Sequence, residues 1–303
     1  MNGIIIVNKT KNCTSHDIVK KAKKILNEKV GHTGTLDPNA TGVLPLLIGK
    51  GTELSKYIID HDKTYESTLK LGEKKDTADS EGKTIEKVDV RIESLEKRNI
   101  EKVFKELIGI QKQVPPIYSA IKVKGKKLYE YARNGENVEI SPRTIEIYKL
   151  ELINIDLKCK TIKFRVECSK GTYIRTLCED IATRLGTIGY MKELKRTKVG
   201  EFNIENSIQI EELEKYILEN SITLDNLEKY LTNKGKSFIT IEKYFNNKKS
   251  IQLDNRKLKL FLNGVQLTYP LEDEIYKIYN NNNFIGIGTI KNELLKREII
   301  IEK

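Results

Sequence analysis

The sequence predicts a mixed α/β protein with a body at 1–235 and a small β-rich unit at 238–303. Through the body, segments with helical spacing of apolar residues alternate with strand-like runs. The segment TNKGKS at 232–237 has the composition of a linker, and mainly strand-like runs follow it. A chain of 303 residues can bury one large and one small core. We therefore expect two domains.

The first elements follow from apolar spacing and from turn residues. The run GIIIVN at 3–8 indicates a buried strand. The segment that starts at Thr14 or Ser15 has the N-cap and the apolar spacing of a helix. GHTGTLDPNATGVLP at 31–45 concentrates glycine, threonine and proline and indicates a loop. A short helix is expected around 53–59.

The rest of the body is predicted from the same patterns. KTYESTLKLG at 63–72 alternates like a strand, and DTADSEG at 76–82 is a turn-rich loop. Further strand-like runs lie at 143–157 and 161–168. Further helical segments lie at 98–108, 125–135, 174–185 and 208–231.

The balance of charge favours a polyanionic partner. The chain has 54 Lys+Arg against 43 Asp+Glu, a net charge of +11, which favours nucleic acid before a membrane. The segment 204–231 carries seven acidic and two basic residues, whereas 109–134 carries six basic residues and one acidic residue. Charge separated in this way lets one face approach phosphates.

Cysteine and histidine give no sign of a metal site. The cysteines form no CxxC pair and the histidines are scattered: Cys13, Cys159, Cys168, Cys178, His16, His32 and His61. Such cysteines fit a reducing cytoplasm, and the opening apolar run is too short for a secretory signal or a membrane span. We expect a cytoplasmic protein without a metal site.

Asp37 is the one acidic side chain in the stretch 31–45. A stiff loop that points a single carboxylate is what a nucleophile or a general base requires. However, Asp before Pro also starts ordinary turns, so local sequence leaves both interpretations open.

Arg175 is the candidate partner of this carboxylate, because a buried carboxylate stays ionised only beside a cation. Arg175 lies in the first turn of its predicted helix, where a cation opposes the helix dipole. That position suggests a specific anionic partner, although a solvated surface arginine is the other interpretation.

The aromatic candidates also have two interpretations. Tyr65 and Tyr173 either pack in the core with a wet hydroxyl or form a stacking surface for an extruded base. His32, between Gly31 and Gly34, is either a turn residue or a ring that contacts nucleotides. The segment 113–135 interleaves tyrosines with lysines, as RNA-binding surfaces and charged outer faces of strand pairs both do.

With these residues assembled, the chain resembles the family of TruB-type tRNA pseudouridine synthases. The resemblance runs through ordered blocks that read VNK at 7–9, GHTGTLDPNATGVLP at 31–45, DKTYE at 62–66, DTADSEG at 76–82, QVPPIYSAIKVKGKKLYEYARNG at 113–135, CSKGTYIRTLCEDI at 168–181 and LKRTKVGEF at 194–202. This family isomerises a uridine in the T loop of tRNA (uridine 55) to pseudouridine. It uses no metal or organic cofactor.

The resemblance implies a role for each candidate in the pocket. Asp37 matches the catalytic aspartate, Arg175 matches the arginine that pairs with it, and Tyr65 matches the active-site tyrosine. Tyr173 matches another pocket residue, and Leu194 matches an apolar residue that lines the pocket.

Two further residues are expected to bind substrate. His32 matches a histidine that contacts bases displaced from the T loop, and Lys9 matches the lysine of the opening block. That block departs from the family's K-P-x-G pattern, since it reads Lys9-Thr10-Lys11-Asn12. The departure puts the conformation of the first loop in doubt, but not the chemistry.

The resemblance also implies a fold and partners. The fold is of the α+β type, with a largely antiparallel sheet, flanking helices and a small PUA-like RNA-binding domain at 238–303. The partner is the tRNA T-arm, with no membrane, no obligatory protein partner and a monomeric state.

Three functional hypotheses are considered. The first is the synthase; the others are a non-catalytic RNA-binding or remodelling module and a guide-RNA-dependent relative that modifies rRNA. Asp37, Tyr65 and Arg175 favour an enzyme, since pure binding does not need them. The sequence leaves open whether Asp37 adds to the base, attacks the sugar or first removes a sugar proton.

Overall fold

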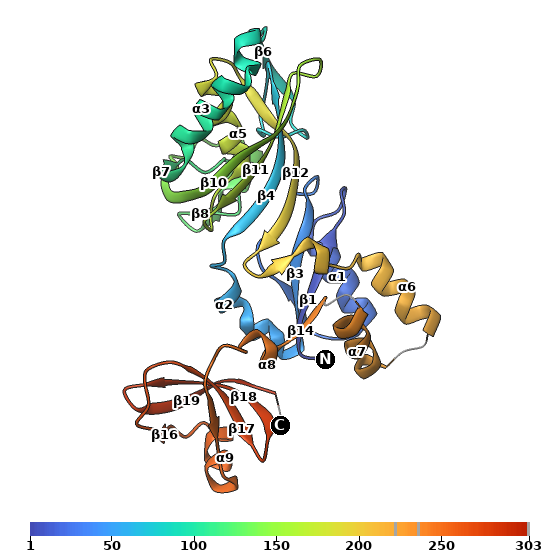
Figure 1. The fold of residues 1–303 in the computed structure, drawn as a ribbon, viewed down its shortest axis with the longest axis vertical. Helices are drawn as coiled ribbons and strands as arrows, with labels where there is room; N and C mark the ends of the chain where they lie inside the picture. The colour runs from blue at the N-terminus through green and yellow to red at the C-terminus, as the bar shows by residue number, and fades with distance from the viewer. Residues whose placement is uncertain (221–222, 235–236, 302–303) are drawn as a thin grey trace.

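The structure, a computed structural model, describes residues 1–220, 223–234 and 237–301. The body is built on one sheet with the following strands: β1 (Gly3–Lys9), β2 (Val30–His32), β3 (Thr41–Ile48), β4 (Lys63–Leu71), β7 (Gly109–Gln113), β10 (Arg143–Asp156), β11 (Thr161–Cys168), β12 (Gly189–Val199), β13 (Phe202–Asn203) and β14 (Phe238–Thr240). The strand order is β14-β1-β3-β12-β4-β11-β10-β7, with β2 paired to β3 and β13 paired to β12 (Figure 1).

Two halves of this sheet meet at a parallel strand pair. β3 and β12 pair in parallel through Thr41–Lys195 and Gly42–Arg196, and the other neighbouring strands of the described sheet are antiparallel. The largely antiparallel sheet is thus confirmed. Gly42 has φ +106°, and a Cβ there would lie 2.1 Å from the Arg196 carbonyl oxygen, so the close approach requires glycine. The first two residues of β3 therefore contact β12 in the middle of the sheet.

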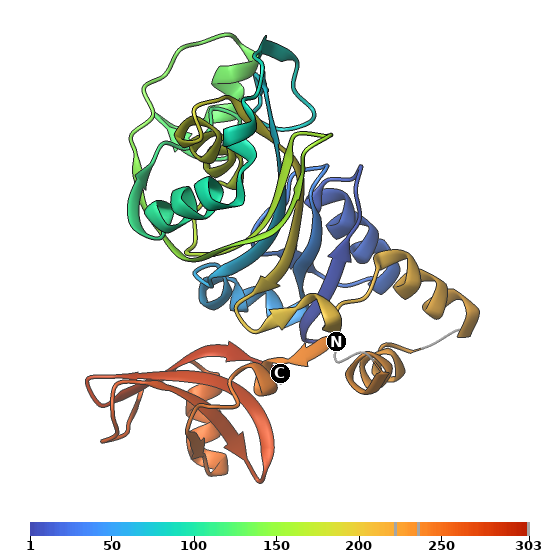
Figure 2. The same cartoon turned by 45° about the horizontal axis from the view of Figure 1, so that its top comes forward.

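Helices cover the sheet and enclose two cores. α1 (Ser15–Leu26), α6 (Ile210–Asn220) and α7 (Leu224–Lys234) pack on β1 and β3, and α3 (Lys97–Leu107) and α5 (Ile174–Arg184) pack on the second half of the sheet (Figures 1 and 2). Thr14 caps α1 in a capping box with Asp17, as the sequence predicts. Among the described residues, no helix has both the length and the apolar character needed to cross a membrane.

Shorter elements complete the body. They are η1 (Gly49–Leu54), α2 (Ser55–Ile58), β5 (Glu73–Lys75), β6 (Thr84–Lys87), η2 (Ile92–Leu95), β8 (Lys122–Val123), β9 (Lys126–Lys127), α4 (Leu128–Arg133) and η3 (Ile204–Asn206). The strands predicted at 3–8, 63–72, 143–157 and 161–168 and the helices predicted at 98–108 and 174–185 are confirmed within a few residues.

The loop predicted over 31–45 is wrong at both ends. β2 and β3 occupy those ends, which leaves a loop only at 33–40. All of β3 except Thr41 is buried, and a strand buried on both faces shows no polar alternation that would reveal it. Pro45, which is uncommon inside a sheet, also favoured the loop.

The C-terminal unit has its own sheet, as predicted. Its strands are β15 (Ser250–Gln252), β16 (Leu267–Thr268), β17 (Ile275–Asn280), β18 (Asn283–Lys291) and β19 (Leu294–Ile300), in the order β15-β17-β18-β19-β16. Helix α9 (Asn255–Leu262) packs against this sheet and contributes Phe261 to a separate core.

The two units are joined by strand pairing and by a shared apolar core, and not by a linker alone. Helix α7 extends through Lys234, so the first part of TNKGKS is helical, and 235–236 lie outside the described residues. β14 then pairs with β1 at the edge of the body's sheet, and α8 (Ile241–Tyr244) follows it. Ile287 and Ile299 of the C-terminal sheet share a core with Ile4 and Ile6 of β1. The division at 235–238 stays a proposal.

Candidate active site

Asp37 lies in the loop at 33–40, which buried side chains hold from behind. The Lys9 ammonium donates hydrogen bonds to the carbonyls of Thr10, Pro38 and Ala40 at 2.9, 3.0 and 2.7 Å. Lys9 is 0% exposed, and burial lowers its pKa. The structure therefore places Lys9 under the loop, where it fixes the backbone around Asp37, and gives it no exposed surface for substrate.

Two more side chains fix the same loop. The Ser15 hydroxyl, at the start of α1, accepts from the Leu36 amide at 2.9 Å and donates to the Leu36 carbonyl at 3.1 Å. Arg196 of β12 donates to the Gly34 carbonyl at 2.8 Å. The Ala40 amide closes a turn on the Asp37 carbonyl at 3.0 Å. The position of the carboxylate is therefore set by a buried network and by a turn, as the stiff loop of the sequence predicts.

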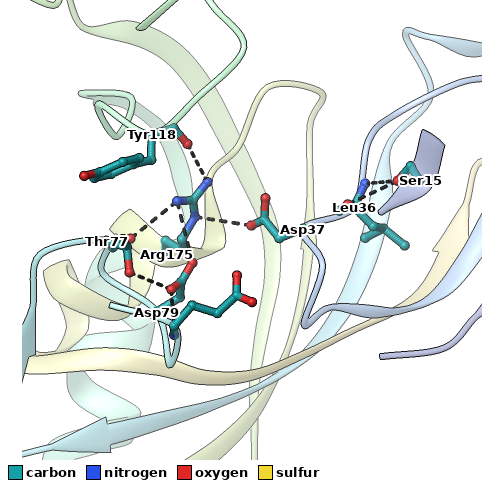
Figure 3. Close-up of polar contacts among 8 residues, drawn as sticks. Ser15, Leu36, Asp37, Thr77, Asp79, Tyr118 and Arg175 are labelled. Atoms are coloured by element: carbon teal, nitrogen blue, oxygen red, sulfur yellow. Dashed lines mark hydrogen bonds and ion pairs between the residues drawn. The ribbon is translucent and has the colours of Figure 1, made fainter. Parts of the chain in front are cut away.

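Arg175 contacts Asp37, as predicted. Its Nε lies 3.3 Å from Asp37 Oδ2, and its Nη1 lies 3.7 Å from Asp79 Oδ2 (Figure 3). Arg175 is the second residue of α5 and is only 7% exposed. A buried cation in the first helical turn is unfavourable without anions; here two carboxylates supply them.

Backbone carbonyls complete the surroundings of Arg175. Nη2 donates to the Tyr118 carbonyl at 2.9 Å and Nη1 to the Thr77 carbonyl at 3.4 Å (Figure 3). The Thr77 hydroxyl and the Glu81 amide both donate to Asp79 Oδ1, at 2.6 and 3.1 Å. The loop 76–82 and the segment after Pro116 therefore fix the guanidinium in one orientation.

The surroundings of Asp37 shift its pKa in opposite directions. Burial raises the pKa of Asp37, and the nearby Asp79 raises it further, whereas Arg175 and Lys9 lower it. The net direction is upward. The expectation that a cation accompanies the carboxylate is met, but the cation only partly offsets the cost of removing the charge of this half-buried group from water.

A pocket opens beside this pair. It is lined by the following residues: Thr35, Leu36, Asp37, Tyr65, Thr172, Tyr173, Ile174, Arg175, Met191 and Leu194. They come from the loop, β4, the start of α5 and β12, which meet where the two halves of the sheet join. Five of the seven predicted site residues thus line one pocket: Asp37, Tyr65, Tyr173, Arg175 and Leu194.

The two tyrosines are held differently. Tyr65 is 9% exposed; burial raises the pKa of its hydroxyl, and the Arg196 guanidinium opposes the rise. The backbone of Tyr173 is clamped by Gln113, whose side chain accepts from the Tyr173 amide at 2.8 Å and donates to its carbonyl at 3.1 Å. Both tyrosines line the pocket; Tyr65 is held by burial of its side chain and Tyr173 by its backbone.

His32 lies apart from the pocket lining. It ends β2, opposite Leu46 of β3, and its Nδ1 is buried without a hydrogen-bond partner. Burial lowers the pKa of the ring, and the positive charge of Arg196 lowers it further. The ring is therefore held towards its neutral form.

Two functional positions were not singled out in the sequence. Asp79 was quoted within DTADSEG only as part of a loop, and Arg196 was quoted within LKRTKVGEF without a role. For Arg196 a signal existed, because it lies two residues after Leu194 on a strand and therefore faces the same side. For Asp79 the turn pattern gave no indication that its carboxylate reaches Arg175.

The chain matches known families over most of its length. Residues 22–174 match the N-terminal domain of the TruB family pseudouridylate synthases, and residues 175–234 match the tRNA pseudouridylate synthase B C-terminal domain. The chain is 41% identical to tRNA pseudouridine synthase B of Caldanaerobacter subterraneus subsp. tengcongensis, with 98% of each chain covered. It is 40% identical to the protein of that name from Clostridium kluyveri, with 96% of each chain covered.

Solved structures show the same fold. A chain in the crystal structure of a Cbf5-Nop10-Gar1 complex superposes with a TM-score of 0.67 at 26% identity and covers 99% of this chain, which in turn covers 84% of it. A chain in the structure of an H/ACA RNP bound to a substrate RNA containing 2′-deoxyuridine gives the same TM-score at 23% identity, with coverages of 99% and 85%.

The fold and the pocket together define a pseudouridine synthase, with one aspartate on a fixed loop at the centre of a mixed sheet. The two matched domains and the full-length relatives assign it further. The chain belongs to the TruB family of pseudouridylate synthases.

Proposed function

We propose that this chain isomerises uridine 55 in the T loop of tRNA to pseudouridine, with Asp37 as the catalytic carboxylate. The observation that carries the proposal is the contact of 3.3 Å between Asp37 and Arg175 on the wall of a pocket. The identity of 41% over 98% of the chain to a tRNA pseudouridine synthase B supports the choice of tRNA.

The reaction is an isomerisation that needs no redox partner. The N1–C1′ bond of the uridine breaks, the uracil turns, and a C5–C1′ bond forms; the C5 proton is lost and N1 gains a proton. A base inside a folded loop must first leave its stack to reach the pocket. Tyr65 and Leu194 then offer an aromatic and an apolar wall. An ionised and fixed Asp37 serves each of the first steps that the sequence leaves open.

The proposal includes how the protein meets its substrate. It acts as a monomer in the cytoplasm, on the T-arm, without metal, organic cofactor or obligatory protein partner. The C-terminal unit is PUA-like and grips RNA away from the pocket. A protein-dependent or guide-dependent assembly is disfavoured, because identity to chains from such complexes is only 23–26%, against 41% for the tRNA enzyme.

Activity on an isolated T-arm tests this function. Purified protein is incubated with a T-arm stem-loop that carries uridine labelled with tritium at C5, without any other RNA or protein. Tritium release and a pseudouridine at position 55 are expected. Tight binding without release would support the RNA-binding module. Release only after another RNA is added would support the guide-dependent relative.

A further inference from the structure

Arg196 is the largest fully buried side chain among the described residues, with an exposure of 1%. It lies on β12 where this strand pairs with β4 on one side and β3 on the other. Its Nε donates to the Val43 carbonyl and its Nη2 to the Gly34 carbonyl, both at 2.8 Å. The guanidinium thus connects the start of the loop that carries Asp37 with strand β3, which follows the loop.

A residue of the pocket lies opposite Arg196. Tyr65 is its cross-strand neighbour on β4, and the positive charge of Arg196 opposes the rise in the pKa of the Tyr65 hydroxyl that burial causes. No carboxylate among the described residues forms an ion pair with Arg196, and the hydrogen bonds of the cation go to backbone carbonyls. A buried charge without a counter-ion is costly. Because the chain has such a charge at Arg196, we infer that the planar geometry of the guanidinium serves a purpose beyond packing.

Gly34 shows how closely the loop fits the guanidinium. Its φ is +73°, and a Cβ at this position would lie 3.2 Å from Arg196 Nη1. The loop backbone therefore lies directly on the planar group. An ammonium is a point charge and cannot donate to the Gly34 and Val43 carbonyls at once with the same geometry.

We propose that Arg196 is a positioning residue for the reaction, which holds the Asp37 loop against β12 at the position opposite Tyr65. It acts on Asp37 through the loop backbone, it lies opposite Tyr65 on the neighbouring strand, and it is not among the residues that line the pocket. This inference rests on the proposed function, because the reaction is what the geometry serves.

The test is a double-mutant cycle of Arg196→Lys and Tyr65→Phe, with pseudouridine formation in tRNA as the readout. For Arg196→Lys we expect kcat to fall by about 100-fold, the scale of a misplaced catalytic group, with KM and the Kd for tRNA unchanged. In the Tyr65→Phe background the same change should cost much less. Arg184→Lys, an exposed arginine paired with Glu106, is the control and should keep full activity.

A kcat for Arg196→Lys within twofold of the wild type, or losses that simply multiply in the double variant, would overturn the inference. A second variant serves if Arg196→Lys does not fold. Gly34→Ala places a Cβ 3.2 Å from Arg196 Nη1 at φ +73°, so its kcat should fall with the Kd for tRNA unchanged. Gly186→Ala, at φ +74° with open space around the added Cβ, is its matched control and should keep kcat.

The two proposals fail in different ways. If the wild-type protein forms no pseudouridine in tRNA, the proposed function is wrong. If the wild type is active and Gly34→Ala has the same kcat as Gly186→Ala, only the positioning role is wrong.

Discussion

Arg175 Nε lies 3.3 Å from Oδ2 of Asp37, and the same guanidinium reaches Oδ2 of Asp79 at 3.7 Å. One buried cation thus serves two carboxylates, of which only Asp37 lines the pocket. Asp79 is hydrogen-bonded to its own loop and holds the cation from behind. Arg175 contacts Oδ2 of Asp37, the other carboxylate oxygen has no contact with the residues drawn in Figure 3, and the side chain is 36% exposed, so Asp37 can meet substrate.

The first prediction is that Asp37→Asn abolishes turnover but not tRNA binding. The change keeps the shape of the side chain and removes its charge, while affinity for RNA comes mainly from phosphate contacts elsewhere. Tritium release from C5-labelled tRNA should disappear, and the Kd from a binding titration should match that of the wild type. Substantial turnover by the variant would contradict the role of Asp37.

The second prediction concerns the planar guanidinium group of Arg175. Arg175→Lys should lose most activity, because an ammonium cannot contact Asp37, Asp79 and the Tyr118 carbonyl in the same geometry. Removing one partner of a buried pair costs about 3–5 kcal/mol. Arg175→Ala should cost less than that, because the Asp37 side chain is 36% exposed. Kinetics and Tm are measured beside Arg184→Lys on the same helix. Full activity together with an unchanged Tm for Arg175→Ala would refute the pairing.

The third prediction follows from the raised pKa of Asp37. Because the carboxylate must be ionised to react, kcat/KM, which reports the free enzyme, should fall as pH drops through a pKa that lies above the ordinary value of 3.8. The sign for stability is opposite: the fold disfavours the ionised form, so this group's contribution is lost as pH rises through the raised pKa. The difference between the Tm of Asp37→Asn and the Tm of the wild type should therefore increase in favour of the variant as pH rises from acid to neutral. A parallel course of the two Tm curves would show that the pKa is not raised.

The candidate pocket could be predicted from local patterns together with the resemblance to a family. Asp37 lies in a glycine- and proline-rich loop, and Arg175 lies at the end of a helix where a cation is out of place, whereas Leu194 came from the resemblance alone. Asp79 gave no such signal, and the spacing of Arg196 from Leu194 indicated its side of the strand but not its partners. Their roles come from contacts between segments far apart in the chain, at Thr77–Arg175 and at Gly34–Arg196.

The difference between local patterns and contacts of distant segments also explains which elements of the fold could be predicted. Amphipathic elements such as α3 and β4 were predictable, because one face is polar. β3 is buried on both faces and has no such signal. The pairing of β14 with β1 could not be read from TNKGKS, because composition reports local flexibility and not which strand receives the following residues.

The fourth prediction is that truncation after residue 237 destabilises the body. The cut removes β14 and the apolar side chains that cover β1: Phe238, Ile241, Phe245, Ile287 and Ile299. A fully buried side chain of this kind contributes about 1.5–3 kcal/mol, so the sum approaches the whole stability of a domain, about 5–15 kcal/mol. A cut after residue 247 keeps β14 and α8 and should be better tolerated. Equal Tm values for the two truncations would contradict the packing across the junction.

The last prediction tests the C-terminal unit without removing it. Helix α9 lies at the far end of this unit from the body (Figure 1) and carries three exposed cations: Arg256, Lys257 and Lys259. If they contact phosphates of tRNA outside the T-arm, changing all three to Gln should raise KM for full-length tRNA and leave kcat unchanged. The slope of log Kd against log salt should become shallower by about 0.9 for each lost contact.

Two controls make this result specific. If α9 contacts only phosphates outside the T-arm, the KM for the isolated T-arm should be unchanged by the triple variant. Changing three exposed cations of α3, Lys97, Arg98 and Lys102, to Gln alters the net charge equally at the other end of the molecule and should leave KM as it was. If kcat instead fell with KM unchanged, α9 would act on the pocket and not on distant phosphates, and if the α3 variant behaved like the α9 variant, the effect would come from overall charge.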